Sequence, residues 1–406
     1  MSLTDRLLFF FLSICLLAMV IPYLFDLGDG NVFINDFYAK RIMTVMFLPF
    51  YLYVFIFSFT GKSALITKDL IYYFIGLVIL VFISILNGNR LSFVITDLFI
   101  FTLPLCFYLL VFKMDFQIKS FVTFFPTLLL LACLITCFDI KLQFSYFSLL
   151  IVGYVVFISE KNFVTLFLLA ILPFVLYNSL IGKSSLLLLF IIIFYFVFFD
   201  KNLVSLSKKV FLFTMPLIII ASAIIIFWNQ IKLTGAYVNT MYFLSNTNFF
   251  ELEFRDHSTL NRIFEALKVI EGFHNSSIIN KLFGNGFGST VDLSKTIDAT
   301  IGKANTDIEN SRIIHLGFFN VLHKYGLLGL SVYFLIIRKV YISCKVIFKY
   351  SLNSTLVLCA LYLVIIVFDS FITFSHMMSN FMFWLIFFIV IKEAKHIMSK
   401  KQKLYA

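Results

Sequence analysis

Long apolar runs alternate with short polar connections along most of the chain. Runs such as VFLFTMPLIIIASAIIIFW (210–228) and STLVLCALYLVIIVFDSFITF (354–374) contain enough residues to cross the roughly 30 Å hydrocarbon core of a bilayer as α-helices. The pattern predicts twelve such helices, at residues 7–25, 42–60, 71–87, 91–112, 120–138, 145–159, 163–179, 184–199, 210–228, 316–337, 353–375 and 380–392. We therefore expect an all-α polytopic membrane protein.

One connection differs from the others in length and character. Residues 229–315 form a polar stretch of 87 residues that contains helical periodicity, with an apolar stripe of Leu260, Ile263, Phe264, Leu267 and Ile270. Such a helix is suited to lie on a membrane surface with its polar side toward water. The chain thus divides into predicted helices one to nine (1–228), a large ordered extracytoplasmic loop (229–315), and helices ten to twelve with a basic tail (316–406).

The composition supports the membrane assignment, because 61% of the residues are hydrophobic and only 13% are charged. The first run, 7–25, is too long for the apolar part of a secretory signal and has no small-residue cleavage site, so we expect a retained anchor helix. With the N-terminus inside, eighteen basic residues fall on the cytoplasmic side and five in the short outer loops. Both termini are therefore predicted to be cytoplasmic, and the net charge of +11 does not indicate nucleic-acid binding.

The sequence indicates no metal, nucleotide or other cofactor. All six cysteines lie in or beside apolar runs, where they are typical packing residues, and none lies in the long loop. The segment LIGKSSLLLL (180–189) contains GKS, but Tyr177 stands where a phosphate-binding P-loop requires glycine. Lys183 in this segment lies at the outer end of a predicted helix. It is either a snorkelling lysine or a cation that faces an anionic group at the membrane surface.

Two segments of the long loop are candidate anion-binding elements. The run LFGNGFGS (282–289) has glycines at Gly284, Gly286 and Gly288, which fit either a tight turn or a loop whose N–H groups approach a phosphate or sugar. In STLNRIFEALKVIEG (258–272), Arg262 either pairs with Glu265 one helical turn later or holds phosphate oxygens. Arg255, Glu265 and His323 are further candidates, which would line the cavity that holds the anion.

The stretch HLGFFNVLHKYGLLGL (315–330) carries three ionisable residues in an otherwise apolar run. On a helix, His315 and His323 share one stripe with Gly326, and His323 lies about 12 Å deeper, whereas Lys324 points nearly the opposite way. The part from Tyr325 onward is predicted to be plain spanning helix. Ionisable groups within a membrane face the bundle interior, and this rule also covers Asp97 and Asp369, to which the sequence assigns no role.

These segments occur in one order that resembles the O-antigen polymerase and O-antigen ligase superfamily of bacterial envelope proteins. The order is a cation at the outer start of a helix, a long outer loop with R-x-x-x-x-A-L and G-x-G-x-G, and then a histidine followed eleven residues later by G-L-L-G. The family pattern H-N-x-x-L-x-x-L-x-x-x-G-L-I-G-L is matched by His315, Leu322, Gly326, Leu327, Gly329 and Leu330. The resemblance covers residues 175–337 in motifs and the whole chain in topology.

The resemblance implies a GT-C-like glycosyltransferase that needs no metal. It would transfer an oligosaccharide from undecaprenyl pyrophosphate to the non-reducing end of a lipid-linked repeat unit, on the periplasmic face of the bacterial inner membrane. Arg262 would bind the pyrophosphate, with Lys183 as a further cation. His315 would either take the acceptor hydroxyl proton or hydrogen-bond the phosphate. Acidic residues of the loop, namely Glu251, Glu253, Asp256 and Glu265, are alternative bases.

The resemblance leaves other functions and partners open. Lys183 stands where ligases carry an arginine, and Leu316 replaces the asparagine that follows the histidine, so the polymerase is favoured over a ligase that moves polysaccharide onto lipid A core. A lipid-oligosaccharide flippase is a third alternative, although no internal repeat typical of transporters is evident. The implied partners are the lipid-linked oligosaccharides, membrane lipid and a separate co-polymerase that sets chain length.

Overall fold

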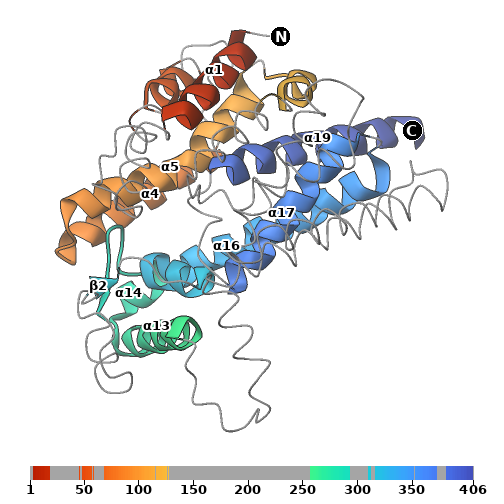
Figure 1. Ribbon diagram of the computed structural model, residues 1–406. Helices are drawn as coiled ribbons and strands as arrows, with labels where there is room; N and C mark the ends of the chain where they lie inside the picture. Colours follow the sequence, from red (N-terminus) through yellow and green to blue (C-terminus); the bar gives the residue numbers. More distant parts are fainter. Residues whose placement is uncertain are drawn as a thin grey trace, which may run out of the picture.

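The computed structural model describes residues 3–18, 45, 48–56, 58, 68–114, 116–125, 127, 257–292, 310–311, 316–351, 353–372 and 381–405. This part of the chain is predominantly α-helical (Figure 1). Its helices are α1 (Leu3–Ala18), α4 (Lys68–Leu86), α5 (Leu91–Lys113), α13 (His257–Asn275), α14 (Ile278–Phe283), α16 (Gly317–Tyr350), α17 (Ser354–Ile372) and α19 (Phe381–Tyr405). Two short strands, β1 (Val291–Asp292) and β2 (Asn310–Ser311), form an antiparallel pair.

The described helices follow the apolar pattern closely at most of their ends. α4, α5 and α17 each match a predicted span to within three residues at both ends, and α16 begins one residue after its predicted start. α16 and α19 extend 13 residues past their predicted ends, because their basic C-terminal segments continue the helix instead of forming loops. Lysine and arginine are good helix formers, so positive charge ends an apolar run without ending a helix.

Two helices of the described part, α5 and α16, are long and apolar enough to cross a membrane, judged by length and composition. Shorter apolar stretches occupy Ile71–Leu86 of α4 and Thr355–Phe368 of α17. Most of the predicted helix 120–138, all of the next four predicted helices, and residues 229–256 lie outside the described residues. The count of twelve helices therefore stays a prediction.

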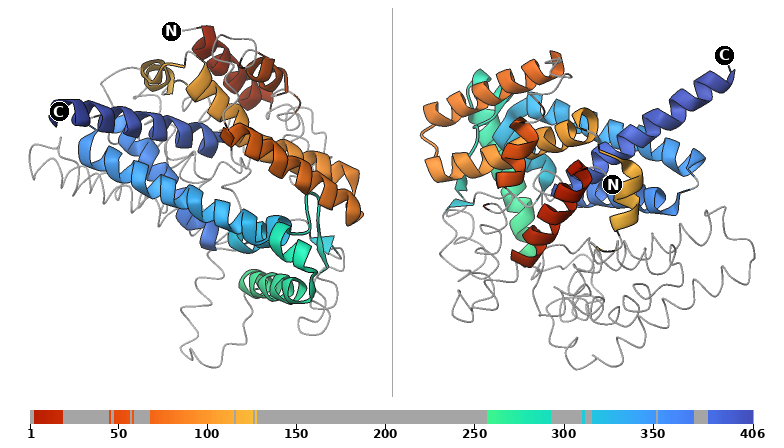
Figure 2. Two further views of the ribbon diagram at one scale, coloured as in Figure 1. Left: turned by 180° about the vertical axis from the view of Figure 1, so that it is seen from behind. Right: turned by 90° about the horizontal axis from the view of Figure 1, so that it is seen from above.

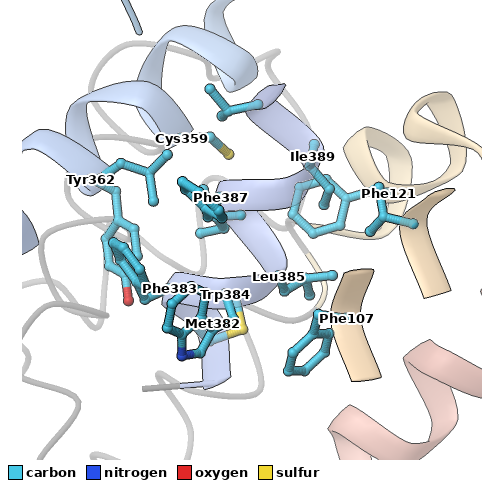
Figure 3. Packing of buried hydrophobic residues seen from close by; sticks show 14 of the residues in the cluster. Phe107, Phe121, Cys359, Tyr362, Met382, Phe383, Trp384, Leu385, Phe387 and Ile389 are labelled. Carbon is cyan, nitrogen blue, oxygen red and sulfur yellow. The ribbon is translucent and has the colours of Figure 1, made fainter. Parts of the chain in front are cut away.

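The main core is built by α19, which packs against α5, α16 and α17 (Figures 1 and 3). Its start is an aromatic segment in which Phe383 stacks on Phe387 and both rings contact Trp384 edge-on. Phe107 of α5 lies in the same cluster. Farther along α19, the Lys392 ammonium donates hydrogen bonds to the carbonyl oxygens of Val111 (2.7 Å) and Phe116 (3.0 Å). This lysine satisfies backbone acceptors at and beyond the C-terminal end of α5, where cations are favoured.

α16 is interrupted near its beginning. Gly326 has φ 63° and ψ −160°, a conformation outside the helical region, so the segment consists of two helices that meet at a kink. The prediction that the chain is plain spanning helix from Tyr325 onward is therefore wrong at Gly326. The stripe that was expected to join His323 to Gly326 on a continuous helix is broken at the same residue.

Candidate functional site

The predicted site residues fall partly inside the described chain. Lys183, Arg255 and His315, together with the alternative bases Glu251, Glu253 and Asp256, lie outside the described residues, although His315 directly precedes the described Leu316. Arg262 lies in the second turn of α13, where only the backbone is described. The three loop glycines, Glu265 and His323 are described, and they lie in one region at the N-terminal end of α16 (Figure 1).

α13 forms where the periodicity predicted a helix, but its buried face differs from the predicted stripe. Leu267 is 54% exposed and Ile270 is 48% exposed, whereas Val269 is only 2% exposed. Val269 and Phe273 pack against Phe319 and Leu322 of α16, and the Glu265 carboxyl is buried on this side of the helix. Leu267 and Ile270 of the predicted stripe are exposed, while a second apolar face of α13 packs on α16, so contact of the stripe with a membrane surface stays a prediction.

The exposed side of α13 carries a simple surface ion pair. The Lys268 ammonium donates a hydrogen bond of 2.8 Å to Glu271, one turn later. This hydrogen bond, with the positive charge of the lysine, lowers the pKa of the Glu271 carboxyl below its ordinary value. The pair stabilises the helix locally and lies away from the buried face that contacts α16.

The glycine-rich run folds into a tight loop that starts at the end of α14. Ser277 caps the start of α14 by accepting a hydrogen bond from the Asn280 N–H, and Gly284 ends the helix by donating to the Asn280 carbonyl. Gly284, Gly286 and Gly288 all have positive φ. We call residues 284–288 the glycine loop. It lies between the turn that joins α4 to α5 and the kinked part of α16 (Figure 2).

On one side the glycine loop is hydrogen-bonded to the kink of α16. The N–H groups of Asn285 and Gly286 donate to the carbonyl oxygens of His323 (2.9 Å) and Lys324 (3.0 Å). In a regular helix these carbonyls would accept from N–H groups one turn later. The break at Gly326 interrupts that pattern, and the glycine loop supplies N–H donors at the same place. The kink and the loop therefore belong to one structural unit.

On the other side the glycine loop is held by two asparagines of the α4–α5 turn. The Asn89 side chain donates to the carbonyl oxygens of Asn285 (2.9 Å) and Phe287 (2.8 Å), and Asn87 donates to Asn285 (3.1 Å). The Phe287 ring is fully buried between the helices, in edge-on contact with Phe101 of α5 and Tyr325 of α16. This aromatic side chain anchors the loop to both helices.

A buried ion pair between α5 and α16 contacts the glycine loop, and the sequence assigned no role to either of its residues. The Lys324 ammonium and the Asp97 carboxylate are 2.8 Å apart, and both side chains are almost fully buried. The same carboxylate oxygen, Oδ2, accepts a hydrogen bond of 2.8 Å from the Gly288 N–H. Lys324 thus points to α5, which explains why it lies away from the predicted histidine stripe.

A signal in the sequence points to this pair. Asp97 lies six residues after the start of α5 and Lys324 lies seven residues after the start of α16, and both starts are at the predicted outer side. At 1.5 Å per residue, both charges are about 10 Å deep. Opposite charges at equal depth in two membrane helices are expected to pair, because each is costly alone.

His323 is a polar residue beside the loop. Its Nδ1 lies 3.2 Å from the Asn285 side-chain nitrogen, so the imidazole accepts at Nδ1 when the amide donates. Its Nε2 is buried near the backbone of Thr290 and has no hydrogen-bond partner of normal geometry in the described part of the chain. The Ser289 hydroxyl is likewise buried without such a partner. These atoms mark a polar region between the loop and α16.

The glycine loop uses its N–H groups within the protein. The N–H groups of Gly284, Asn285, Gly286 and Gly288 all donate to protein oxygens. The turn function predicted for the glycines is therefore present, while their contact with a phosphate or sugar stays a prediction. Among the described residues there is no group of three or more histidine, cysteine, aspartate or glutamate side chains that could hold a metal ion.

Neither a protein-family model nor a curated protein matches the sequence. Inferences about the chemistry of this region therefore rest on its own residues and on the resemblance of its motifs.

Proposed function

We propose that the protein is a bacterial surface-polysaccharide polymerase. It transfers an oligosaccharide from undecaprenyl pyrophosphate to the non-reducing end of a lipid-linked repeat unit. The proposal includes twelve membrane helices in a GT-C-like arrangement, an inner-membrane location and both termini in the cytoplasm. It also includes a co-polymerase partner that sets chain length.

One observation carries the proposal. Three segments that supply the sequence motifs lie together: α13 packs on the start of α16, and the glycine loop is hydrogen-bonded to the same part of α16. Arg262 is in α13, and His315 directly precedes the α16 segment. The association supports a shared role at the predicted outer face.

The chemistry requires cations that meet a leaving pyrophosphate. The acceptor hydroxyl attacks the anomeric carbon of the donor sugar, the bond from that carbon to the phosphate oxygen breaks, and the pyrophosphate departs with the electron pair. We assign Arg262, with Lys183, to stabilise that negative charge. We assign His315 to the acceptor proton or to a phosphate hydrogen bond. Four N–H groups of the glycine loop already donate to protein oxygens. We therefore assign the loop to hold α13 and α16 in place, and not to bind the pyrophosphate itself.

Deletion of the gene tests the reaction class. Loss of a polymerase leaves surface lipopolysaccharide that carries a single repeat unit. Loss of a ligase, the second candidate, leaves no attached polysaccharide while long polymer stays on undecaprenyl. Loss of a flippase leaves unpolymerised units on the cytoplasmic side. An unchanged polysaccharide ladder would remove all three functions.

Substitutions then test the assigned residues in the deletion background. Arg262→Ala and His315→Ala are expected to abolish chain extension while the protein still inserts at normal levels. Lys268→Ala is the matched control, because Lys268 lies on the same helix as Arg262 and forms a surface ion pair with Glu271 away from the face that contacts α16. A normal ladder from either site variant would remove that residue from the site. His323→Ala shows whether the polar region beside the loop takes part in the transfer.

A further inference from the structure

Two of the groups that contact the Asp97 carboxylate place different requirements on it. Lys324 needs a negative charge nearby, whereas the Gly288 N–H needs only an acceptor oxygen. A buried ion pair can often be replaced by apolar side chains of similar size with little loss of stability. A buried N–H cannot be satisfied by an apolar side chain. The two interactions of Asp97 are therefore separable by substitution.

The Gly288 hydrogen bond lies at the start of a chain of contacts that leads to α13. Three residues after Gly288, the β1 strand begins with Val291, which is buried against Val269 of α13 and Leu322 of α16. Phe287, on the other side of Gly288, is buried between α5 and α16. The glycine loop thus connects α5 to the interface between α13 and α16.

We propose that Asp97 is a positioning residue: by accepting the Gly288 N–H it holds the glycine loop between α5 and α16, and so fixes α13 relative to the start of α16. The effect on transfer rests on the proposed function, since α13 contains Arg262 and His315 precedes α16. Docking of the loop does not depend on that function. Lys324 contacts the same carboxylate oxygen, but the loop itself requires only an acceptor oxygen at that place.

Two double variants separate the acceptor from the charge. Asp97→Asn with Lys324→Gln removes both charges and keeps an amide oxygen that can accept from Gly288. Asp97→Leu with Lys324→Met also removes both charges, at similar side-chain volume, but leaves no acceptor at position 97. Both are made in a full-length Ser289→Cys background, because Ser289 is buried next to Gly288 and becomes accessible when the loop leaves the helices.

The first measurement is the rate at which a polar maleimide labels the cysteine at position 289 in the purified protein. Labelling of the native cysteines is measured in the same protein without Ser289→Cys and is subtracted. Labelling is expected to be slow in the parent and in the Asn/Gln variant. In the Leu/Met variant, labelling is expected to be at least about tenfold faster. This factor corresponds to the loss of a buried hydrogen bond worth about 1.4 kcal/mol. The second measurement is the polysaccharide ladder in deletion cells that express each variant at equal level.

Each outcome has a definite consequence. The proposal is supported if the Leu/Met variant labels faster and extends shorter chains while the Asn/Gln variant behaves as the parent. Slow labelling of the Leu/Met variant would overturn it, as would fast labelling of both variants, which would make the charge the essential feature. Where deletion does shorten the ladder, fast labelling of the Leu/Met variant together with a normal ladder would also overturn the positioning role. If labelling follows expectation but the deletion does not alter the ladder, the proposed function fails and the docking role of Asp97 remains.

Discussion

Gly284→Ala is the sharpest test of how the glycine loop is held. Gly284 has φ 78° and ψ −170°, a conformation that only glycine adopts readily. A Cβ at this position would lie 2.3 Å from both the carbonyl carbon and the oxygen of Lys324, and 2.4 Å from the Tyr325 nitrogen. These are backbone atoms in the kinked part of α16, which also contains Gly326. No side-chain rotation can relieve the contact.

The expected magnitude follows from these two effects. An L-residue forced into this backbone region costs on the order of 1–3 kcal/mol. Inserting a methyl group into a filled space costs about 1–3 kcal/mol more. Even the smallest sum, about 2 kcal/mol, shifts the equilibrium between the docked and the open loop by roughly 30-fold. Larger values would keep the loop open in most molecules.

Hydrogen exchange of the loop amides measures this shift directly. The N–H groups of Asn285, Gly286 and Gly288 are hydrogen-bonded in the docked loop, so they exchange only when it opens. Gly284→Ala is expected to accelerate their exchange by about 30-fold or more, in line with the lower estimate. Gly272→Ala is the control, because a Cβ there meets nothing within 4 Å and the residue lies inside α13. Unchanged exchange in Gly284→Ala would refute the docked geometry.

Three further substitutions test the contacts that hold the described helices together. Lys324→Met removes the cation that is paired with the buried Asp97 carboxylate, and we expect the free energy of unfolding to fall by about 3–5 kcal/mol. Lys268→Met is the control, because it removes a surface ion pair with Glu271 and should leave the stability nearly unchanged. Both are measured by thermal unfolding in detergent. Tyr333→Phe removes a buried hydroxyl that contacts the Ser370 hydroxyl at 2.6 Å, with an expected loss of about 1 kcal/mol in the same assay. Lys392→Met removes two hydrogen bonds to backbone carbonyls beside α5, and a loss of about 2 kcal/mol is expected. Equal stability of the Lys324 and Lys268 variants, or no loss in either of the other two, would contradict the corresponding contact.

The helices were the most predictable part of the structure. Apolar run length placed α4, α5 and α17 well, because few other arrangements satisfy a long apolar segment. The ends of α16 and α19 were missed, since the basic residues that follow the apolar run are also helix formers. The buried face of α13 was missed because apolar residues occur on both sides of that helix.

The candidate site was only partly predictable. The glycines at 284, 286 and 288 correctly indicated a tight turn, but the sequence does not show what the loop packs against. Its partners are residues near 87–97 and 323–326, which are distant along the chain and carry no joint motif. Gly326 shows the same limit. A glycine in an apolar helix usually serves close packing, whereas Gly326 has positive φ and lies directly against the backbone of Leu282 and Gly284.

The Asp97–Lys324 pair has a consequence for biosynthesis. The two residues are 227 positions apart, so a ribosome adding about 5–20 residues per second completes Lys324 roughly 10–45 s after Asp97. During that interval α5 already exists, while its cation does not, and the glycine loop is added only 36 to 40 residues before that cation. The nascent chain must keep a carboxyl group in an apolar segment until α16 arrives. Assembly of this region is therefore a late event in the production of the protein, and the first half of the chain cannot complete it alone.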